Sequence, residues 1–258
     1  MLWIILTQFL FRATFGVAFA MVATPASLIS SGFFRVHLWV IMGANTLVAL
    51  TLFSQRNSAD HAGQGMTLAI AIVVCSYFGA VAWLYEKKRT GNIFVALIMT
   101  LALIASVLSG REMNGAANVN YWVAGVDALS AGFLLGSTLT AMFLGHWYLN
   151  SPGMQLRPLR RLVLFILIAV SLRMLVCGTG LREELFSPAM ARAGTPYLLA
   201  LRWLSGLLGL ALMAVMTWNT LRIPNTQSAT GILYVGVIFA CLGELTSQFL
   251  TAGSEFPL

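Results

Sequence analysis

The stretch Tyr121–Tyr148 reads YWVAGVDALSAGFLLGSTLTAMFLGHWY, and among Asp, Glu, Lys and Arg it contains only Asp127. A helix needs about 20 predominantly apolar residues to cross the hydrocarbon core of a bilayer. The stretch also holds Gly132 and Gly136 in a Gly-x-x-x-Gly pattern, which lets two membrane helices approach closely. It therefore predicts a transmembrane helix that packs tightly against a neighbour.

The composition extends this interpretation to the whole chain of 258 residues, of which 59% are hydrophobic and only 9% are charged. The mean hydropathy is +0.86. A soluble domain carries about 25% charged residues, because water must wet its surface. An ordinary soluble enzyme and a disordered chain are thus excluded. The net charge of +7 does not indicate nucleic-acid binding, since most basic residues lie in short loops between apolar spans.

Seven further apolar stretches accompany the first. An open strand could not satisfy its backbone in lipid, so each stretch predicts a helix. The connections are short, and we expect an all-α integral membrane protein with a single polytopic domain over residues 1–258. The eight predicted spans are Trp3–Ala26, Val36–Ser54, Met66–Tyr85, Asn92–Ser109, Tyr121–Tyr148, Leu162–Cys177, Pro196–Trp218 and Thr230–Leu250.

Lysine and arginine predict the orientation, because they gather in cytoplasmic loops. We expect the more basic side to be cytoplasmic, both termini to be periplasmic, and the protein to lie in the inner membrane. The more basic side carries Arg35, Lys87, Lys88, Arg89, Arg157, Arg160, Arg161 and Arg222, and the other side carries Arg56, Arg111, Arg182 and Arg192.

Two local similarities indicate an internal duplication. The segment Leu28–Arg35 after the first span resembles Leu149–Arg157 at the end of the fifth, and Thr-Gly opens both the fourth and the eighth span. Units four spans apart have the same orientation, so a duplication would produce two parallel four-helix bundles, about 1–115 and 116–258. The matches are short, and chance similarity is the alternative.

Five charged residues lie inside the predicted spans: Arg12, Asp127, Arg173, Arg202 and Glu244. A charge at the bilayer centre costs about 2.5–3.5 kcal/mol on insertion scales, so these residues are expected to be partners of one another. With the orientation above, all five converge on the outer half of the membrane. We expect each carboxylate to lie within salt-bridge reach of an arginine.

Polar neighbours enlarge this layer. Gln8 precedes Arg12 by about one helical turn, and Ser247 and Gln248 follow Glu244 at i+3 and i+4 on the same helix face. Two interpretations stay open. Either the charges form pairs that hold the bundle together, or they line a polar pocket for an anionic or redox-active ligand.

Histidine and cysteine are poorly placed for a metal or haem site. His37 and His146 lie at the cytoplasmic ends of spans and each is close to a loop, so we expect structural anchors and no haem. Cys75, Cys177 and Cys241 fall inside separate spans without a Cys-x-x-Cys pair, which is typical of small buried hydrophobes. We expect no metal site.

The last span contains Leu242-Gly243-Glu244-Leu245, and its Gly-Glu-Leu part is similar to the NrfD / polysulfide-reductase membrane subunit family. This family includes the anchor subunit of dimethyl sulfoxide reductase. Eight helices, periplasmic termini and a four-plus-four arrangement resemble the family over nearly the whole chain. The sequence departs from the family pattern at Gln248, where an arginine would be expected.

The resemblance implies a non-haem membrane anchor subunit of a respiratory redox complex. Such a subunit binds menaquinone or ubiquinone near the outer face and exchanges electrons with an iron–sulfur partner of a multisubunit oxidoreductase. On this interpretation the carboxylates of Glu244 and Asp127 carry protons, and the other polar groups hold the quinone oxygens. These binding residues would be Arg12, Arg173, Arg202, Gln248 and Gln8.

Two other classes of function stay open. Intramembrane arginines could bind the carboxylate or phosphate of a small solute in an anion transporter. Secondary transporters usually bind at the midplane, however, whereas this layer is predicted nearer one side. The chain could also be a structural membrane scaffold subunit that holds no ligand.

Overall fold

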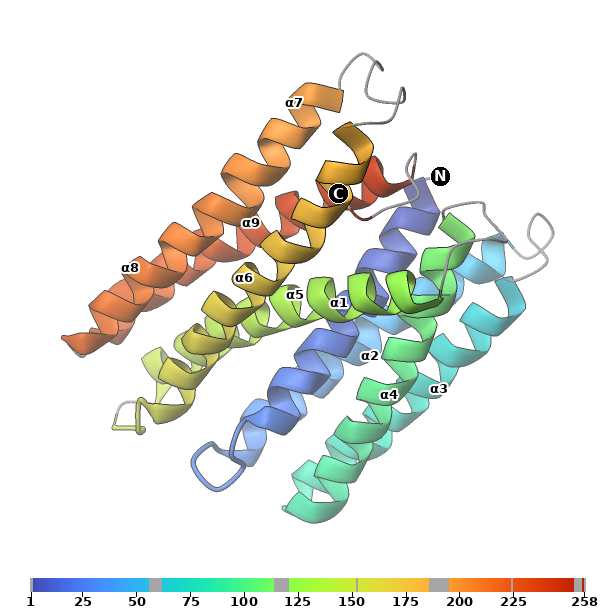
Figure 1. Cartoon of the computed structure of the whole chain (residues 1–258). Helices are drawn as coiled ribbons and strands as arrows, with labels where there is room; N and C mark the ends of the chain where they lie inside the picture. The colour runs from blue at the N-terminus through green and yellow to red at the C-terminus, as the bar shows by residue number, and fades with distance from the viewer. Residues whose placement is uncertain are drawn as a thin grey trace.

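All regular secondary structure in the described part of the computed structural model is helical (Figure 1). The structure describes residues 2–55, 62–113, 121–151, 153–185, 195–223, 225–252 and 257. Within these ranges eight helical stretches are long and apolar enough to cross a membrane, which confirms the predicted all-α, multi-pass membrane protein.

The helices occur in the expected order along the chain. α7, η2 and α8 follow one another without a gap and together form the seventh span. The elements are α1 (Leu2–Ala23), α2 (Ser31–Ser54), α3 (Ala62–Leu84), α4 (Lys88–Met113), α5 (Tyr121–Asn150), α6 (Arg157–Leu185), α7 (Thr195–Ala200), η2 (Leu201–Gly209), α8 (Leu210–Arg222) and α9 (Thr226–Thr251).

Most helices extend beyond the apolar stretches that predict them. α6 spans Arg157–Leu185, whereas its apolar part predicts Leu162–Cys177. A helix continues as long as its backbone bonds are satisfied, so hydropathy marks the lipid-facing segment and not the helix ends. The predicted end of the first helix at Ala26 is wrong in the other direction. α1 ends at Ala23, because Pro25 has no N–H with which to continue it.

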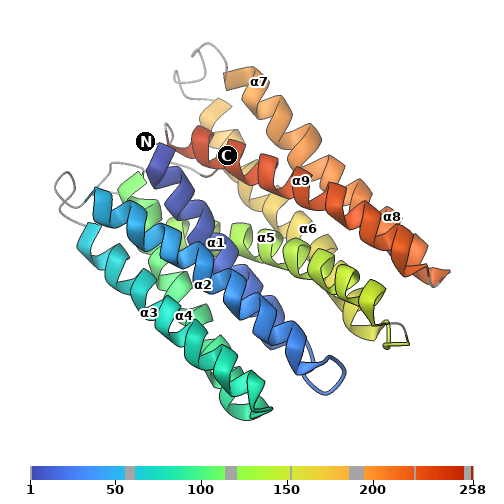
Figure 2. The same ribbon diagram turned by 180° about the vertical axis from the view of Figure 1, so that it is seen from behind.

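The two halves of the chain form two groups of helices that lie side by side (Figures 1 and 2). In the first half α1 packs on α2, α2 on α3, α3 on α4 and α4 on α1. In the second half α5 packs on α6, α6 on α8, α8 on α9 and α9 on α5. The order of packing is thus the same in both halves, and α1 and α5 form the seam between them. A gene duplication as its origin stays a prediction.

The seam is a backbone-to-backbone contact between α1 and α5. A Cβ added at Gly136 would overlap the backbone of Gly16, and one added at Gly16 would overlap the carbonyl oxygen of Gly132. Two helices can approach this closely only where residues lack a Cβ. The close contact predicted for the Gly-x-x-x-Gly pattern is confirmed, and its partner is α1.

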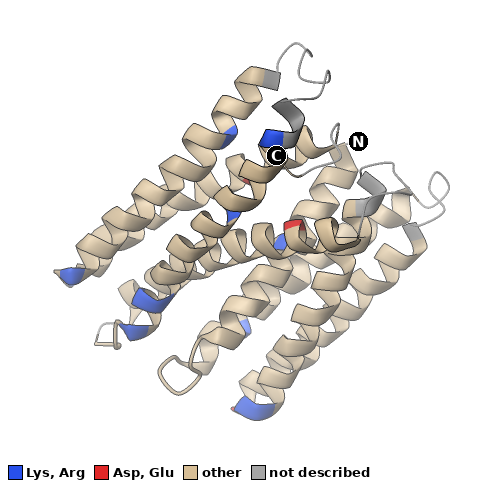
Figure 3. Ribbon diagram, viewed as in Figure 1, with Lys and Arg blue, Asp and Glu red and all other residues tan. Residues whose placement is uncertain are grey.

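Basic residues gather at the end of the bundle that lies opposite the two termini (Figure 3). There Arg160 Nη2 at the start of α6 donates to the Leu221 carbonyl at the end of α8, at 2.7 Å. At the other end the side chains of Arg56, Arg111 and Arg192 lie outside the described residues, while Arg182 is described and exposed. Which end faces the cytoplasm stays a prediction.

Candidate functional site

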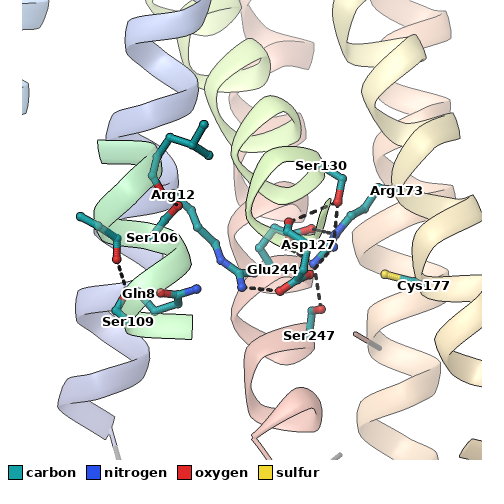
Figure 4. A network of polar contacts seen from close by, with 12 residues as sticks. Gln8, Arg12, Ser106, Ser109, Asp127, Ser130, Arg173, Cys177, Glu244 and Ser247 are labelled. Carbon is teal, nitrogen blue, oxygen red and sulfur yellow. Dashed lines mark hydrogen bonds and ion pairs between the residues drawn. The ribbon is translucent and has the colours of Figure 1, made fainter. Parts of the chain in front are cut away.

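Charged side chains from five spans meet in one chain of ion pairs inside the bundle. Figure 4 shows Arg12, Asp127, Arg173 and Glu244 pointing toward one another. Arg12 of α1 donates to one oxygen of Asp127 of α5, and Arg173 of α6 donates to the other from Nη1 at 2.6 Å. Arg173 also donates from Nε and Nη2 to the two oxygens of Glu244 of α9, at 3.0 and 2.9 Å. Arg202 of η2 completes the chain with Nη2 2.9 Å from Glu244 Oε1.

All five residues are buried, and Asp127 is the most exposed of them at 5%. Removing an ion from water costs several kcal/mol, and only well-placed partners offset the loss. Each carboxylate here contacts two guanidinium groups, so the predicted pairing of Asp127 and Glu244 with arginine is confirmed. Three arginines against two carboxylates leave one positive charge in excess. We call this set of five residues the ion-pair chain.

Two serines and a cysteine extend the ion-pair chain. Arg173 Nη1 lies 3.1 Å from Ser130 Oγ, and its Nη2 lies 3.2 Å from Ser247 Oγ. Cys177 is buried as expected, but its Sγ also lies 3.4 Å from Arg202 Nη2. Ser247 was expected here from its spacing to Glu244, whereas Ser130 was not, although it follows Asp127 at the same i+3 spacing.

The two predicted glutamines do not contact the ion-pair chain through any hydrogen bond among the described residues. Gln8 of α1 accepts a hydrogen bond from Ser109 of α4, and its Nε2 has no partner among them. Gln248 of α9 is 1% exposed, and neither atom of its amide has a partner there. An unsatisfied buried polar group costs about 1–3 kcal/mol, so such groups indicate a bound water or ligand.

Arg202 is the least satisfied cation of the ion-pair chain. Within the described ranges its Nε and Nη1 have no hydrogen-bond partner, and its side chain is fully buried. It lies in the π-helical segment η2, together with the buried residues Gly206 and Leu207. π-helical turns are frequent at functional sites. The sequence did not reveal this segment, because the apolar pattern of Leu201–Gly209 is equally compatible with an α-helix.

The two predicted anchor histidines have different partners. His37 Nδ1 lies 2.5 Å from the Phe33 carbonyl oxygen, one turn earlier on α2, and its ring packs against Phe33 and Phe143. His146 Nδ1 lies 3.1 Å from the Tyr234 hydroxyl of α9. Among the described residues no group of three or more His, Cys, Asp and Glu side chains could hold a metal ion. Each histidine thus has a partner of its own within the chain.

Comparison with known proteins does not assign a family. No protein-family model, no curated protein and no solved structure matches this chain. The resemblance to the NrfD / polysulfide-reductase membrane subunit family therefore stays a prediction, and the function has to be inferred from the geometry of the site.

Proposed function

We propose that this chain is the membrane subunit of a respiratory oxidoreductase and binds a quinone head group at the ion-pair chain. The observation that carries the proposal is a buried cluster of charges with one positive charge in excess, inside a bundle of apolar spans. A quinone has acceptor oxygens for such a cluster and an apolar tail that partitions into lipid. The proposal includes menaquinone or ubiquinone as the quinone, an iron–sulfur partner at the outer face, and the inner membrane as the location.

The donors in the site fit a quinone head group. Within the described residues, Nε and Nη1 of Arg202 and Nε2 of Gln248 are buried donors with no partner. A buried donor that has lost its water gains from any acceptor, and a hydrogen bond from a charged donor is worth about 1.5–3 kcal/mol. A bound quinone supplies the exchange of two electrons with the partner and of two protons with nearby groups.

The part that this chain plays in that exchange is to hold the head group and to move protons. Glu244 Oε1 lies 2.9 Å from Nη2 of Arg202, whereas Asp127 reaches Arg202 only through Arg173 and Glu244. Proton transfer requires hydrogen-bond reach or one intervening water. We therefore place Glu244 first as the proton carrier and Asp127 second.

A structural scaffold is the second candidate, and the complete pairing of both carboxylates favours it. Arg173 alone contacts Asp127, Glu244, Ser130 and Ser247, which ties α5, α6 and α9 together without a ligand. A fully satisfied polar network makes a protein interior rigid. A scaffold gives no role to the excess positive charge, nor to the two Arg202 nitrogens that have no partner in the part of the chain that the structure describes. For this reason the quinone proposal comes first.

The test is the quinone content and activity of the complex, purified from its native membrane through a tag on this chain. We expect bound quinone in a stoichiometric amount, co-purifying iron–sulfur and catalytic subunits, and electron transfer with menadiol or ubiquinol-1. A complex that retains no quinone and reacts with neither quinol would contradict the proposal and favour the scaffold.

The orientation is tested separately, because the proposal places the site near the outer face. A reporter fused after Leu258 is expected to behave as periplasmic, and one inserted at Lys87–Arg89 as cytoplasmic, owing to the basic residues at that end. The opposite result would move the ion-pair chain to the inner half of the membrane and contradict an outer quinone site.

A further inference from the structure

Four arginines gather where the start of α6 meets the end of α8. All four are exposed, and they are Arg157, Arg160 and Arg161 of α6 and Arg222 of α8. A hydrogen bond from Arg160 Nη2 to the Leu221 carbonyl, at 2.7 Å, joins the two helix ends. Figure 3 shows basic residues at both of these helix ends. We call these four residues the arginine cluster.

The arginine cluster has no carboxylate to neutralise it within this half of the chain. The sequence contains no Asp or Glu between Asp127 and Glu183, and none between Glu184 and Glu244. Asp127 and Glu244 belong to the ion-pair chain, while Glu183 and Glu184 come at the opposite end of α6. The first turn of α6 holds no acidic residue, so the positive end of the helix dipole adds to the repulsion between the arginines. An anion from outside this half is needed to offset these charges.

Two of the four guanidinium groups are held in place by contacts within the chain. Arg160 donates to the Leu221 carbonyl, and Arg161 Cζ lies 5.4 Å from the ring centroid of Phe165 in a cation–π contact. A guanidinium has five N–H donors in a rigid arrangement that matches the oxygens of a phosphate. The Leu221 carbonyl takes only one of these donors from Arg160, and both arginines are exposed. The cluster therefore presents positioned donors at the surface.

An exposed apolar ridge runs along α6 from the arginine cluster. Leu164, Ile168 and Leu172 follow Arg160 at steps of four residues, and such steps form one ridge on a helix surface. The three side chains are between 43% and 45% exposed, as expected for residues that contact lipid. Arginines near the end of a membrane helix place their charged group at the level of the lipid head groups. A lipid whose acyl chain lies along this ridge would thus have its phosphate beside Arg160.

We infer that the arginine cluster binds the phosphate of an anionic phospholipid whose acyl chain lies along this ridge. Guanidinium groups form strong charge-assisted hydrogen bonds to phosphate, and basic sites between transmembrane helices bind the head groups of anionic lipids. A zwitterionic lipid brings an ammonium group that the unneutralised arginines repel, so the charge of the cluster selects an anionic one. An acidic protein surface would also offset the charge, but it gives no role to the apolar ridge beside the arginines.

The lipid site is separate from the ion-pair chain, and the inference goes beyond the proposed function. Arg161 precedes Arg173 by 12 positions on α6. This spacing corresponds to about 18 Å along the helix at 1.5 Å per residue. Binding of lipid at one place and of a quinone at the other can therefore be measured independently.

The experiment measures binding of phosphatidylglycerol to the full-length chain by native mass spectrometry in detergent, with phosphatidylcholine as the zwitterionic comparison. We expect the wild type to bind phosphatidylglycerol at least about tenfold more tightly than phosphatidylcholine. We expect the double variant Arg160→Gln/Arg161→Gln to weaken phosphatidylglycerol binding at least about tenfold, because it removes two charged donors from the phosphate.

The matched control is Lys87→Gln/Lys88→Gln, where α3 meets α4. It removes the same number of charges at the same end of the bundle, but there Glu86 adjoins the basic residues. We expect phosphatidylglycerol binding to stay within about twofold of wild type, since the arginine cluster is intact. An equal loss in both double variants would overturn the inference, because the attraction would then come from the basic end as a whole.

A second variant guards against misfolding, since Arg160 also connects α6 to α8. Arg157→Gln/Arg222→Gln leaves the Arg160 hydrogen bond and the Arg161 contact in place and changes only exposed residues. We expect it to keep the melting temperature of the lipid-free protein and to bind phosphatidylglycerol about tenfold more weakly. Wild-type affinity in this variant would overturn the inference, as would failure of both arginine variants to fold.

The remaining outcomes point to other ligands. Equal binding of phosphatidylglycerol and phosphatidylcholine by the wild type would overturn the inference. Displacement of phosphatidylglycerol by inorganic phosphate at the same concentration would overturn it in favour of a free anion. Loss of a co-purifying acidic protein from Arg160→Gln/Arg161→Gln, with phosphatidylglycerol binding unchanged, would overturn it in favour of a protein partner. Because none of these results involves quinone, the inference and the proposed function fail separately.

Discussion

The polar interiors of the two halves differ in charge. In the first half Asn45 of α2 donates to Thr14 of α1 at 2.9 Å, and Ser109 of α4 donates to Gln8 of α1. Both contacts join two helices with neutral groups. The second half instead contains four of the five residues of the ion-pair chain, and Arg12 reaches into it across the seam. Neutral hydrogen bonds therefore connect helices in the first half, whereas charged groups connect them in the second.

The two kinds of interior are expected to differ strongly in their response to substitution. Hydrogen bonds between membrane helices contribute about 0.6 kcal/mol on average. Breaking a buried ion pair by removing one partner costs about 3–5 kcal/mol, because it leaves a buried charge without compensation. Substitutions in the two halves can therefore test whether the charged contacts contribute more to the free energy of unfolding than the neutral ones.

The largest effect is expected from Arg173→Met. Among the described residues Arg173 alone pairs with both carboxylates, and its loss leaves Asp127 and Glu244 with one arginine each. We expect the free energy of unfolding to fall by about 3–5 kcal/mol, measured by denaturation in detergent. A loss no greater than that of a neutral contact in the first half would contradict the contrast between the halves.

Glu244→Gln tests whether the Glu244 carboxylate carries protons during turnover. The change keeps the shape of the side chain and one acceptor oxygen, but it replaces the other oxygen with an amide donor and removes the proton acceptor. We expect quinol-linked turnover per assembled complex to fall about a hundredfold, as for a lost general acid–base group. Asp127→Asn is the matched control and should reduce turnover less. Unchanged turnover with less assembled protein would show that Glu244 only holds the helices together.

Gly136→Ala tests the seam between the halves. The added Cβ would overlap the Gly16 backbone, so α1 and α5 must move apart. We expect a loss of about 1–3 kcal/mol in the free energy of unfolding, typical of overpacking. Gly125→Ala on the same helix is the control, because its Cβ would meet nothing within 4 Å. Equal free energies of unfolding for the two variants would mean that α1 and α5 are not tightly packed at the seam in solution.

The smallest effect is expected from Thr14→Val, which removes the hydroxyl that accepts from Asn45. The side chains have similar shapes, so the change isolates one neutral contact between α1 and α2. We expect a loss of about 0.6 kcal/mol, measured by the same denaturation in detergent. A loss comparable to that of Arg173→Met would show that the first half depends on its polar contacts as strongly as the second.

Part of the site could be predicted because charged residues within apolar spans can be recognised in the sequence. Arg12, Asp127, Arg173, Arg202 and Glu244 each interrupt an apolar span, and the insertion cost predicts that such residues find one another. The identity of the partners could not be predicted. Arg12 and Asp127 are separated by 115 positions, and no local pattern selects that pair over the alternatives.

Other features of the site depend on packing between distant spans. The glutamines satisfied the same helical spacing as the charged residues, yet Gln8 pairs with Ser109 of α4 instead. The π-helical turn at Arg202 was not expected either, and the small residue Gly206 indicated a close helix contact without identifying Gly243 as its partner. Each arises where two helices cross, and a crossing point is not encoded in the periodicity of either helix.

The sequence by itself determined that the chain is helical, crosses the membrane eight times and brings its intramembrane charges together. These properties follow from segment length, from hydropathy and from the cost of an unpaired charge in lipid, all of which are local. Only the tertiary structure decided that Arg173 lies between both carboxylates, that α1 meets α5 through glycine backbone, and that Arg202 keeps two nitrogens without a partner among the described residues. The physical reason is that side-chain partners depend on how helices distant in sequence cross, and this is fixed by shape and close packing between them.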